Sequence, residues 1–177
     1  MIYEFCAENV TLLEKAMQAG ARRIELCDNL AVGGTTPSYG VTKAAVELAT
    51  NHDTTIMTMI RPRGGDFVYN DLEIAIMLED IRLTAQAGSQ GVVFGALTDD
   101  KKLDKPNLEK LIAASKGMEI VFHMAFDELS EEDQLEAIDW LSQAGVTRIL
   151  TRAGVSGDSL EKRFAHYHRI LEHAKGK

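Results

Sequence analysis

The sequence is poor in the residues that would place it in a specialised class. Among 177 residues there are 2 cysteines, 3 prolines and 1 tryptophan, and aromatic residues make up 6%. Two cysteines are too few for a disulfide framework, which suits a reducing cytoplasm. No apolar run of about 18 residues is present, so we expect no transmembrane span. The segment Met1–Cys6 lacks the basic and long apolar regions of a secretory signal.

An excess of positive charge is also missing. The chain has 27 acidic and 19 basic residues, with a net charge of −8. This balance argues against nucleic acid or an anionic membrane as the main partner. The hydrophobic fraction of 45% and the charged fraction of 26% are ordinary for a soluble globular protein of about one domain. We therefore expect a cytoplasmic protein that binds neither nucleic acid nor membrane.

The apolar pattern predicts strands that alternate with helices. The expected strands are residues 2–7, 23–28, 55–61, 91–96, 119–126 and 148–151. The expected helices after the first are residues 41–50, 71–87, 107–115, 131–144 and 160–174. The first helix lies between Asn9, its predicted cap, and Gly20, which ends it; Asp71 and Ser130 are predicted to cap two later helices. Strands flanked by helices throughout predict an α/β fold, either a barrel or a doubly wound sheet.

The number of expected strands is low for a complete barrel. Six strands are expected here, whereas a TIM-type (β/α) barrel has eight. We therefore expect a single barrel domain over residues 1–177 that is incomplete at its C-terminal end, with an open slot between the first and last strands. Such an open side, or an acidic helix face, would support a homodimer.

Polar residues fall on one face of several predicted strands. Side chains alternate along a strand, so residues two apart share a face. If these faces point into a barrel, the residues near its axis include Glu4, Glu25, Arg61 and His123. Charged groups buried together must pair, because desolvation otherwise costs several kcal/mol. The pattern favours a functional site, and a structural ion network is the alternative.

The two cysteines end adjacent predicted strands. Neighbouring strands lie ~4.8 Å apart, so Cys6 and Cys27 can approach one soft metal ion. Thiolates favour Cu(I) or Zn over Mg or Ca. Met57, Met59 and Met124 offer thioether sulfur, although ordinary core packing is the alternative for them. Buried small hydrophobic residues are the alternative for the cysteines.

Two long loops follow the second and third strands. The backbone N–H groups of Gly33 and Gly34 can approach an anion in the first loop. Arg61 and Arg63 in the second can hold a carboxylate or phosphate, and Asp66 can pair with one of them. A lid without a ligand and a structural Arg–Asp lattice are the alternatives.

These residues support a second interpretation, a barrel enzyme that acts on a small anionic substrate. In it, Arg61 and Arg63 bind the anion, His123 acts as acid or base, and Glu25 orients or assists. Asp127 joins His123 only if the turn between them brings its carboxylate back. A satisfied core histidine and a scaffold protein without chemistry are the competing interpretations.

Five stretches of the chain are distinctive as a set: residues 23–27 (RIELC), 33–40 (GGTTPSYG), 60–69 (IRPRGGDFVY), 91–95 (GVVFG) and 122–127 (FHMAFD). Together they resemble the bacterial CutC family, also called copper homeostasis protein CutC. The resemblance implies a TIM-type barrel, a cytoplasmic location, copper binding and a role in copper tolerance or trafficking. It suggests Cys6 and Cys27 as the ligands of Cu(I). It also marks six motif members, Glu25, Arg61, Arg63, Asp66, His123 and Asp127.

The chain departs from this family pattern in two places. Met124 stands where the family usually has arginine in His-Arg-Ala-Phe-Asp. The family also continues past a helix like 160–174 into further strands, one of them glycine-rich. We expect Met124 to point away from the face of His123, so the site is little affected by the first change.

Overall fold

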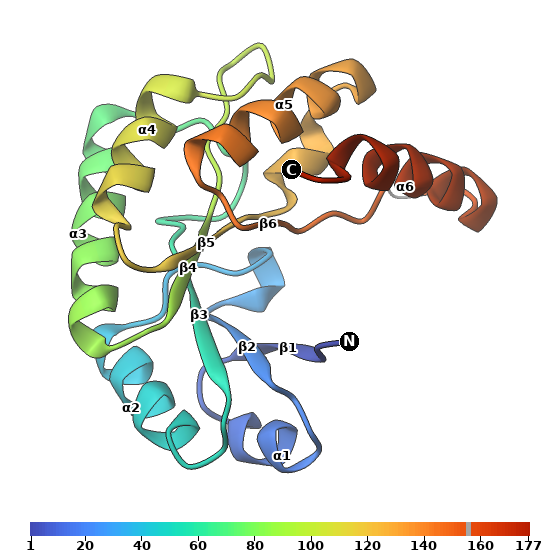
Figure 1. Ribbon diagram of the computed structural model, residues 1–177. Helices are drawn as coiled ribbons and strands as arrows, with labels where there is room; N and C mark the ends of the chain where they lie inside the picture. The colour runs from blue at the N-terminus through green and yellow to red at the C-terminus, as the bar shows by residue number, and fades with distance from the viewer. Residues whose placement is uncertain (155–156) are drawn as a thin grey trace.

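The computed structural model describes residues 1–154 and 157–177, and their strands form one parallel sheet in the order β1-β2-β3-β4-β5-β6. The strands are β1 (Glu4–Glu8), β2 (Arg23–Cys27), β3 (Thr55–Met59), β4 (Gly91–Phe94), β5 (Glu119–Phe122) and β6 (Arg148–Ile149). The α-helices are α1 (Leu13–Gln18), α2 (Tyr39–Ala49), α3 (Asp71–Ala87), α4 (Lys105–Ala114), α5 (Glu131–Ala144) and α6 (Leu160–Ala174). The helices cover the outer side of the curved sheet (Figure 1), so the predicted (β/α) barrel with six units is confirmed as a half-barrel.

The two faces of the sheet have different partners. Outward-facing Ile24, Leu26 and Ile56 join one apolar cluster with α1 and α2. A larger cluster continues from β4 and β5 against α3 to α6. The inner face carries a separate group, which consists of Cys27, Met57, Met59, Val93 and Val121. The alternation of side chains therefore places the polar and sulfur-bearing residues inside, as predicted.

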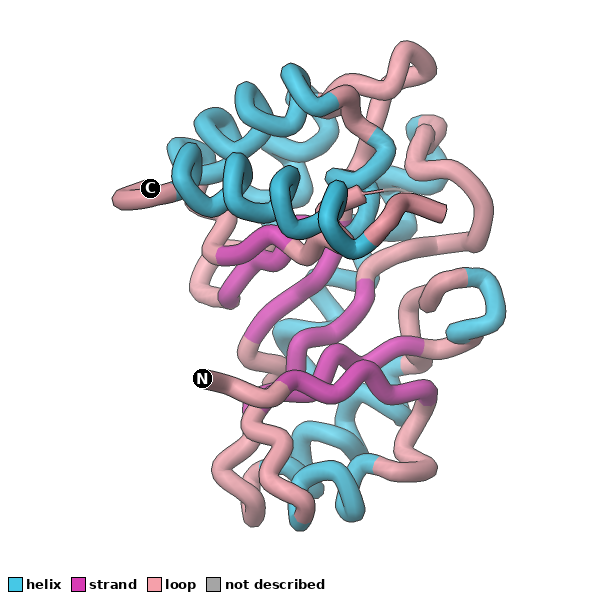
Figure 2. The backbone as a smooth tube through the Cα atoms, turned by 90° about the vertical axis from the view of Figure 1, so that its right-hand side faces the viewer, coloured by secondary structure: helices cyan, strands magenta, loops and turns pink. Residues whose placement is uncertain are grey.

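The half-barrel is open along one side. Within residues 1–154 and 157–177, no strand pairs with the outer edge of β1 or of β6. Figure 2 looks toward this open side, with the N-terminus at the β1 edge of the sheet and the C-terminus beyond the β6 edge. In the same described ranges, no helix has the length and apolarity needed to cross a membrane. A homodimer formed through the open side stays a prediction.

Two predicted caps were wrong. Asn9 does not cap α1, because its φ of 57° puts it in a left-handed turn and the helix begins after Leu12. Helix α3 is capped by Asn70 rather than Asp71, and the side chain of Glu73 closes a capping box with Asn70. The predicted cap of α5 by Ser130 is confirmed.

The fifth strand is shorter than predicted. β5 ends at Phe122; the backbone of His123 is still extended, but residues 124–126 lie outside the extended conformation predicted for them. Instead, Nδ1 of His123 accepts a hydrogen bond from the Ala125 N–H at 3.2 Å, and the chain enters the 3₁₀-helix η2 (Met124–Glu128). A side chain that caps the next turn thus stops the strand at the site itself.

Candidate functional site

Three side chains on β1 and β2 form a group that we name the thiol cluster: Cys6, Glu25 and Cys27. Cys27 ends β2 as predicted, but Cys6 lies in the middle of β1 rather than at its end. One ligand atom from each lies within 4.8 Å of the others. The Cys6 thiol donates to Glu25 Oε1 at 3.4 Å, and the Cys27 thiol donates to the same oxygen at 3.8 Å. The prediction that the two cysteines converge is confirmed in its geometry. Glu25, expected near the barrel axis, stands between them.

Strand register produces this convergence. Cys6 pairs with Glu25, and Glu8 pairs with Cys27 in the parallel ladder of β1 and β2. Gly34 packs directly against the thiol of Cys27, because a Cβ built on this glycine would lie 3.0 Å from Cys27 Sγ. Its φ of 88° also belongs to the left-handed region that favours glycine. The loop therefore reaches the thiol only because this residue has no side chain.

Two groups of the thiol cluster, the Glu25 carboxyl and the Cys27 thiol, have raised pKa values. Burial raises the pKa of Glu25, and the negative charge of Glu4 adds to that rise. The hydrogen bond with Cys6 raises the pKa of Cys27, and burial raises it further. A cation that binds Cys27 must therefore displace the proton of its thiol.

The two thiols differ in access to solvent. Cys27 is fully buried, with 0% exposure, whereas Cys6 is exposed. A cavity of about 270 Å³ lies beside Cys6 and Glu25, bounded across the open side by Arg148 and Leu150. A small ion therefore has a route to the cluster from the interior of the half-barrel.

Arg61 connects the two long loops. Its guanidinium donates to the carbonyls of Val32 at 2.9 Å, Gly34 at 3.0 Å and Gly65 at 2.7 Å. The same group lies 4.8 Å from the centre of the Phe67 ring. Arg61 is 4% exposed, so these contacts are largely removed from water. It fixes the loop that carries Gly34 against the loop that follows β3.

Arg63 is held in a second, more exposed lattice. It donates to Glu73 at 2.5 Å, to Asp66 at 3.0 Å and to the Val68 carbonyl at 2.7 Å. The pairing of Asp66 with an arginine is therefore present. These partners raise the pKa of Arg63.

The predicted anion cradle has few donors left for a ligand. The N–H of Gly33 donates to the Leu30 carbonyl, and that of Gly34 donates to the Asn29 carbonyl. Both amides are thus engaged within their own loop. Among the described residues, Arg61 Nε has no hydrogen-bond partner.

His123 lies buried on the other side of Phe67. The two ring centres are 4.7 Å apart, and His123 is 3% exposed. Burial lowers the pKa of His123 to about 3, with a further contribution from the charge of Arg61. Its Nε2 has no partner within the described ranges. The imidazole is therefore neutral at ordinary pH.

The turn after His123 does not bring Asp127 back to it. Asp127 accepts hydrogen bonds from the Thr151 hydroxyl and the Arg152 N–H. Glu4 is likewise engaged elsewhere, in an ion pair with Arg23 at 3.2 Å. The expected single cluster near the axis is therefore two groups: the thiol cluster, and a stack of Arg61, Phe67 and His123, which we name the Phe67 stack.

Two residues of these sites were missed by sequence reasoning. Phe67 gave no signal of its own, since an aromatic residue in a loop has many uses. Arg148, whose pairing with Glu119 holds it beside the cavity, was detectable because it alternates with Leu150 in the predicted strand 148–151. Both are positioned by partners far away in the sequence.

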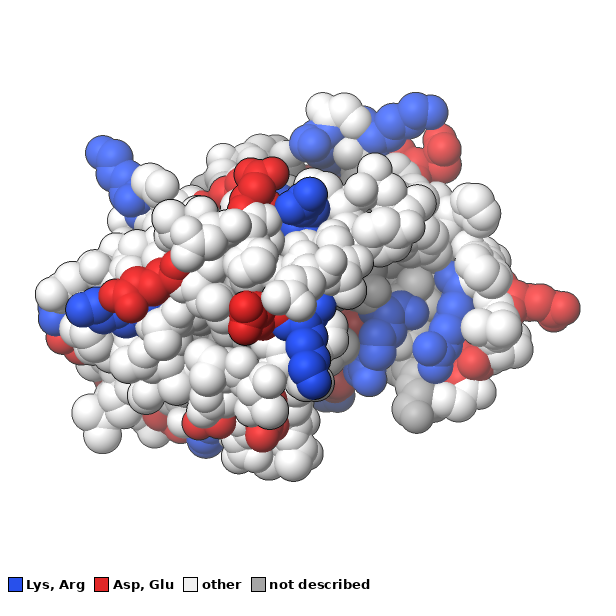
Figure 3. Space-filling model, turned by 90° about the horizontal axis from the view of Figure 1, so that it is seen from below, with Lys and Arg blue, Asp and Glu red and all other residues white. Residues whose placement is uncertain are grey.

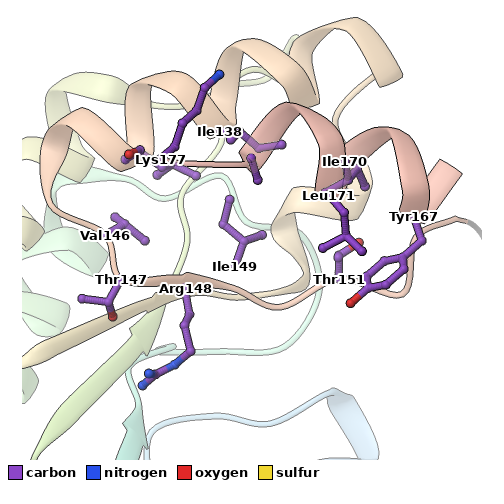
Figure 4. A pocket seen from close by; sticks show the side chains of 13 residues that line it. Ile138, Val146, Thr147, Arg148, Ile149, Thr151, Tyr167, Ile170, Leu171 and Lys177 are labelled. Atoms are coloured by element: carbon purple, nitrogen blue, oxygen red, sulfur yellow. The ribbon is translucent and has the colours of Figure 1, made fainter. Parts of the chain in front are cut away.

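Another cavity, of about 220 Å³, lies on the helix side of β6 (Figure 4). Ile149 and Ile170 enter it, whereas Arg148 points away from it toward the strands. Its lining is mainly apolar and offers no set of converging charged groups. The charged groups on the face seen in Figure 3 are of both signs and do not form a continuous basic surface.

Comparisons with known proteins agree on one family. The sequence model of the CutC family matches residues 1–177. A CutC family protein of Enterococcus faecalis is 52% identical over 98% of this chain and 83% of its own length. The human protein named copper homeostasis protein cutC homolog is 41% identical over 99% of this chain and 62% of its own length.

Solved structures give the same result. A CutC protein from Streptococcus agalactiae has a TM-score of 0.95 and 45% identity, covering 99% of this chain and 84% of that chain. An archaeal fructose 1,6-bisphosphate aldolase has a TM-score of 0.67 at 15% identity, covering 93% of this chain and 62% of that one. The aldolase shows likeness of fold alone, which supports the assignment to the (β/α) barrels.

Proposed function

Because the chain belongs to the CutC family, we propose that it is a cytoplasmic copper homeostasis protein that binds Cu(I) through Cys6 and Cys27. Relatives named for copper homeostasis support the copper assignment. Copper is the cargo in this proposal. The observation that supports it most directly is the position of the two thiols on neighbouring strands, where the sulfur atoms of Cys6 and Cys27 lie within 4.8 Å of each other.

The donor chemistry fits this ion. Thiolate sulfur is soft and favours Cu(I) or Zn, whereas Mg and Ca prefer oxygen. Cys27 is buried and fixed by Gly34, while Cys6 borders the cavity. Cys6 therefore meets the incoming ion first, and Cys27 holds it away from water. Each thiol gives up its proton when the ion binds.

The test is an anaerobic competition titration of the full chain with a chromophoric Cu(I) chelator. We expect Cys6→Ser and Cys27→Ser each to weaken Cu(I) binding by more than about 100-fold, because losing a ligand costs more than losing an outer partner of one. Unfolding curves of both variants control for the fold. Unchanged affinity in both folded variants would contradict the proposal.

A second candidate is an enzyme acting on a small anionic substrate at the Phe67 stack. Three buried polar atoms there lack a partner among the described residues: Arg61 Nε, Tyr69 Oη and His123 Nε2. Arg61 and Arg63 would then bind the anion, and His123 would act as acid or base; the predicted partners Gly33, Gly34, Glu25 and Asp127 are engaged elsewhere. Binding of inorganic phosphate that shifts the His123 ring resonances, and that is lost in Arg61→Met, would support this function over copper.

A further inference from the structure

We infer that Met59 supplies a third ligand, a thioether sulfur, to the Cu(I) ion held by Cys6 and Cys27. This inference rests on the proposed function and concerns the composition of the same site. Three neighbouring strands would then each contribute one sulfur from the inner face of the half-barrel.

The register places Met59 beside Cys27. In the ladder of β2 and β3, Glu25 pairs with Met57 and Leu26 pairs with Thr58, so the next step brings Cys27 opposite Met59. Alternation turns both side chains inward, and both belong to the same buried cluster. Met59 is 3% exposed. Methionine has three rotatable side-chain bonds, so its sulfur can adjust to an ion at the neighbouring thiol.

Met57 occupies the same face but directs its sulfur elsewhere. A Cβ built on Gly91 would lie 2.6 Å from Met57 Sδ, so the sulfur rests against Gly91. Arg148 Nη2 lies 3.8 Å from the same atom. The sulfur of Met57 is thus directed toward β4 and β6, away from Cys27. The chain therefore contains a matched control one inward position from Met59.

Charge favours the thioether over the carboxylate of Glu25. The thiolates of Cys6 and Cys27 with one Cu(I) already carry a net negative charge, and Cys27 is buried. A neutral sulfur adds no charge to that site, whereas an ionised carboxylate adds another that must be desolvated. Cu(I) also prefers soft sulfur to hard oxygen. Glu25 accepts hydrogen bonds from both thiols in the metal-free protein, and this is a sufficient role for it there.

The decisive experiment uses the full chain labelled with selenomethionine and loaded anaerobically with Cu(I). Selenium-edge X-ray absorption then reports directly whether copper lies next to selenium. We expect copper–selenium scattering in the unsubstituted sequence and in Met57→Leu, and its loss in Met59→Leu. Leucine and methionine have similar volumes, so both variants are expected to fold, which unfolding curves check.

Affinity provides a second readout. We expect Met59→Leu to weaken Cu(I) binding by about 10- to 100-fold, less than the loss of either cysteine because both thiolates remain, and Met57→Leu by less than about threefold. Absence of copper–selenium scattering in the unsubstituted protein, or its persistence in Met59→Leu, would overturn the inference. A loss of affinity in Glu25→Gln with none in Met59→Leu would identify the carboxylate as the third ligand instead.

The outcomes separate this inference from the proposed function. If copper-edge spectra show two sulfur ligands that disappear in Cys6→Ser and Cys27→Ser, the copper site stands and only the role of Met59 fails. If the cysteine variants bind Cu(I) as well as the unsubstituted chain does, the proposed function itself fails.

Discussion

The thiol cluster and the Phe67 stack lie on one half-barrel but use their polar atoms in opposite ways. In the thiol cluster, the groups contact mainly each other through long hydrogen bonds of 3.4 and 3.8 Å. In the Phe67 stack, Arg61 gives its donors to three backbone carbonyls of the two loops. The first arrangement leaves donor atoms available to an ion, and the second uses them to hold the protein.

This difference teaches that residue type does not by itself separate binding from support. A buried arginine next to glycines predicts an anion site, yet Arg61 meets carbonyl oxygens of its own chain. Cysteines without a metal motif predict little, yet Cys6 and Cys27 converge on one carboxylate. The acceptor that a donor meets decides its role, and only the fold supplies that acceptor.

Removing Arg61 should produce the largest loss of stability. Arg61→Met leaves three carbonyls without their donor, and we expect the free energy of unfolding to fall by about 3 kcal/mol or more. Arg63→Met is the matched control; its side chain is 38% exposed, so we expect a loss of about 1 kcal/mol. Urea unfolding measures both. Equal losses would erase the distinction between buried support and surface pairing.

Titration of His123 should give the next largest effect. Its pKa of about 3 in the folded state lies below the ordinary value of 6.5. Between these values the unfolded chain binds a proton that the folded protein does not, so stability is complete above pH 6.5 and falls as pH drops toward 3. The slope from this group reaches up to about 1.4 kcal/mol per pH unit.

His123→Asn isolates this contribution. The asparagine side chain does not titrate and can still accept from the Ala125 N–H. We therefore expect the variant to lose less stability between pH 6.5 and pH 4 than the unsubstituted protein does, as measured by urea unfolding at each pH. Parallel pH profiles would show that the imidazole is not buried neutral.

Alanine at Gly34 or Gly33 should cost less stability than the loss of Arg61 and should separate the two regions. Both glycines have φ near 90°, so each alanine should cost about 1–2 kcal/mol. The added methyl group at position 34 approaches Cys27 Sγ at 3.0 Å, whereas at position 33 it approaches Arg61 Nη1 at 3.2 Å. We expect Gly34→Ala to weaken Cu(I) binding more than Gly33→Ala in the same chelator titration. The reverse order would contradict the placement of the ion at Cys27.

Sequence reasoning located the elements with regular periodicity and failed where a long-range contact decided the structure. Helices α3, α5 and α6 have the predicted bounds, because their apolar stripes and ends are local features. The predicted end of β5 was wrong, because the side chain of His123 accepts a hydrogen bond from the Ala125 N–H and turns the chain there.

The candidate site shows the same division. Strand adjacency predicted that Cys6 and Cys27 would approach each other, and strand pairing places them so. That Glu25 stands between them, apart from Arg61 and His123, was not predicted. The acceptors of Arg61 could not be predicted, since Val32 and Gly34 lie in a different loop, 29 and 27 residues away in the chain. Pairing across such distances leaves no periodic signal.

The open side also has a consequence for cooperativity. Each strand of the half-barrel packs mainly on its neighbours, as in a linear array with two ends, and such arrays lose structure from the ends inward. The outer-face clusters divide at β3, where Ile56 belongs to one and Ile60, just past the strand, to the other. Amide hydrogen exchange should therefore be slowest in β3 and β4 and become faster toward β1 and β6. The thiol cluster lies on the β1 side, so the same exchange measurement reports on the part of the sheet proposed to take up copper.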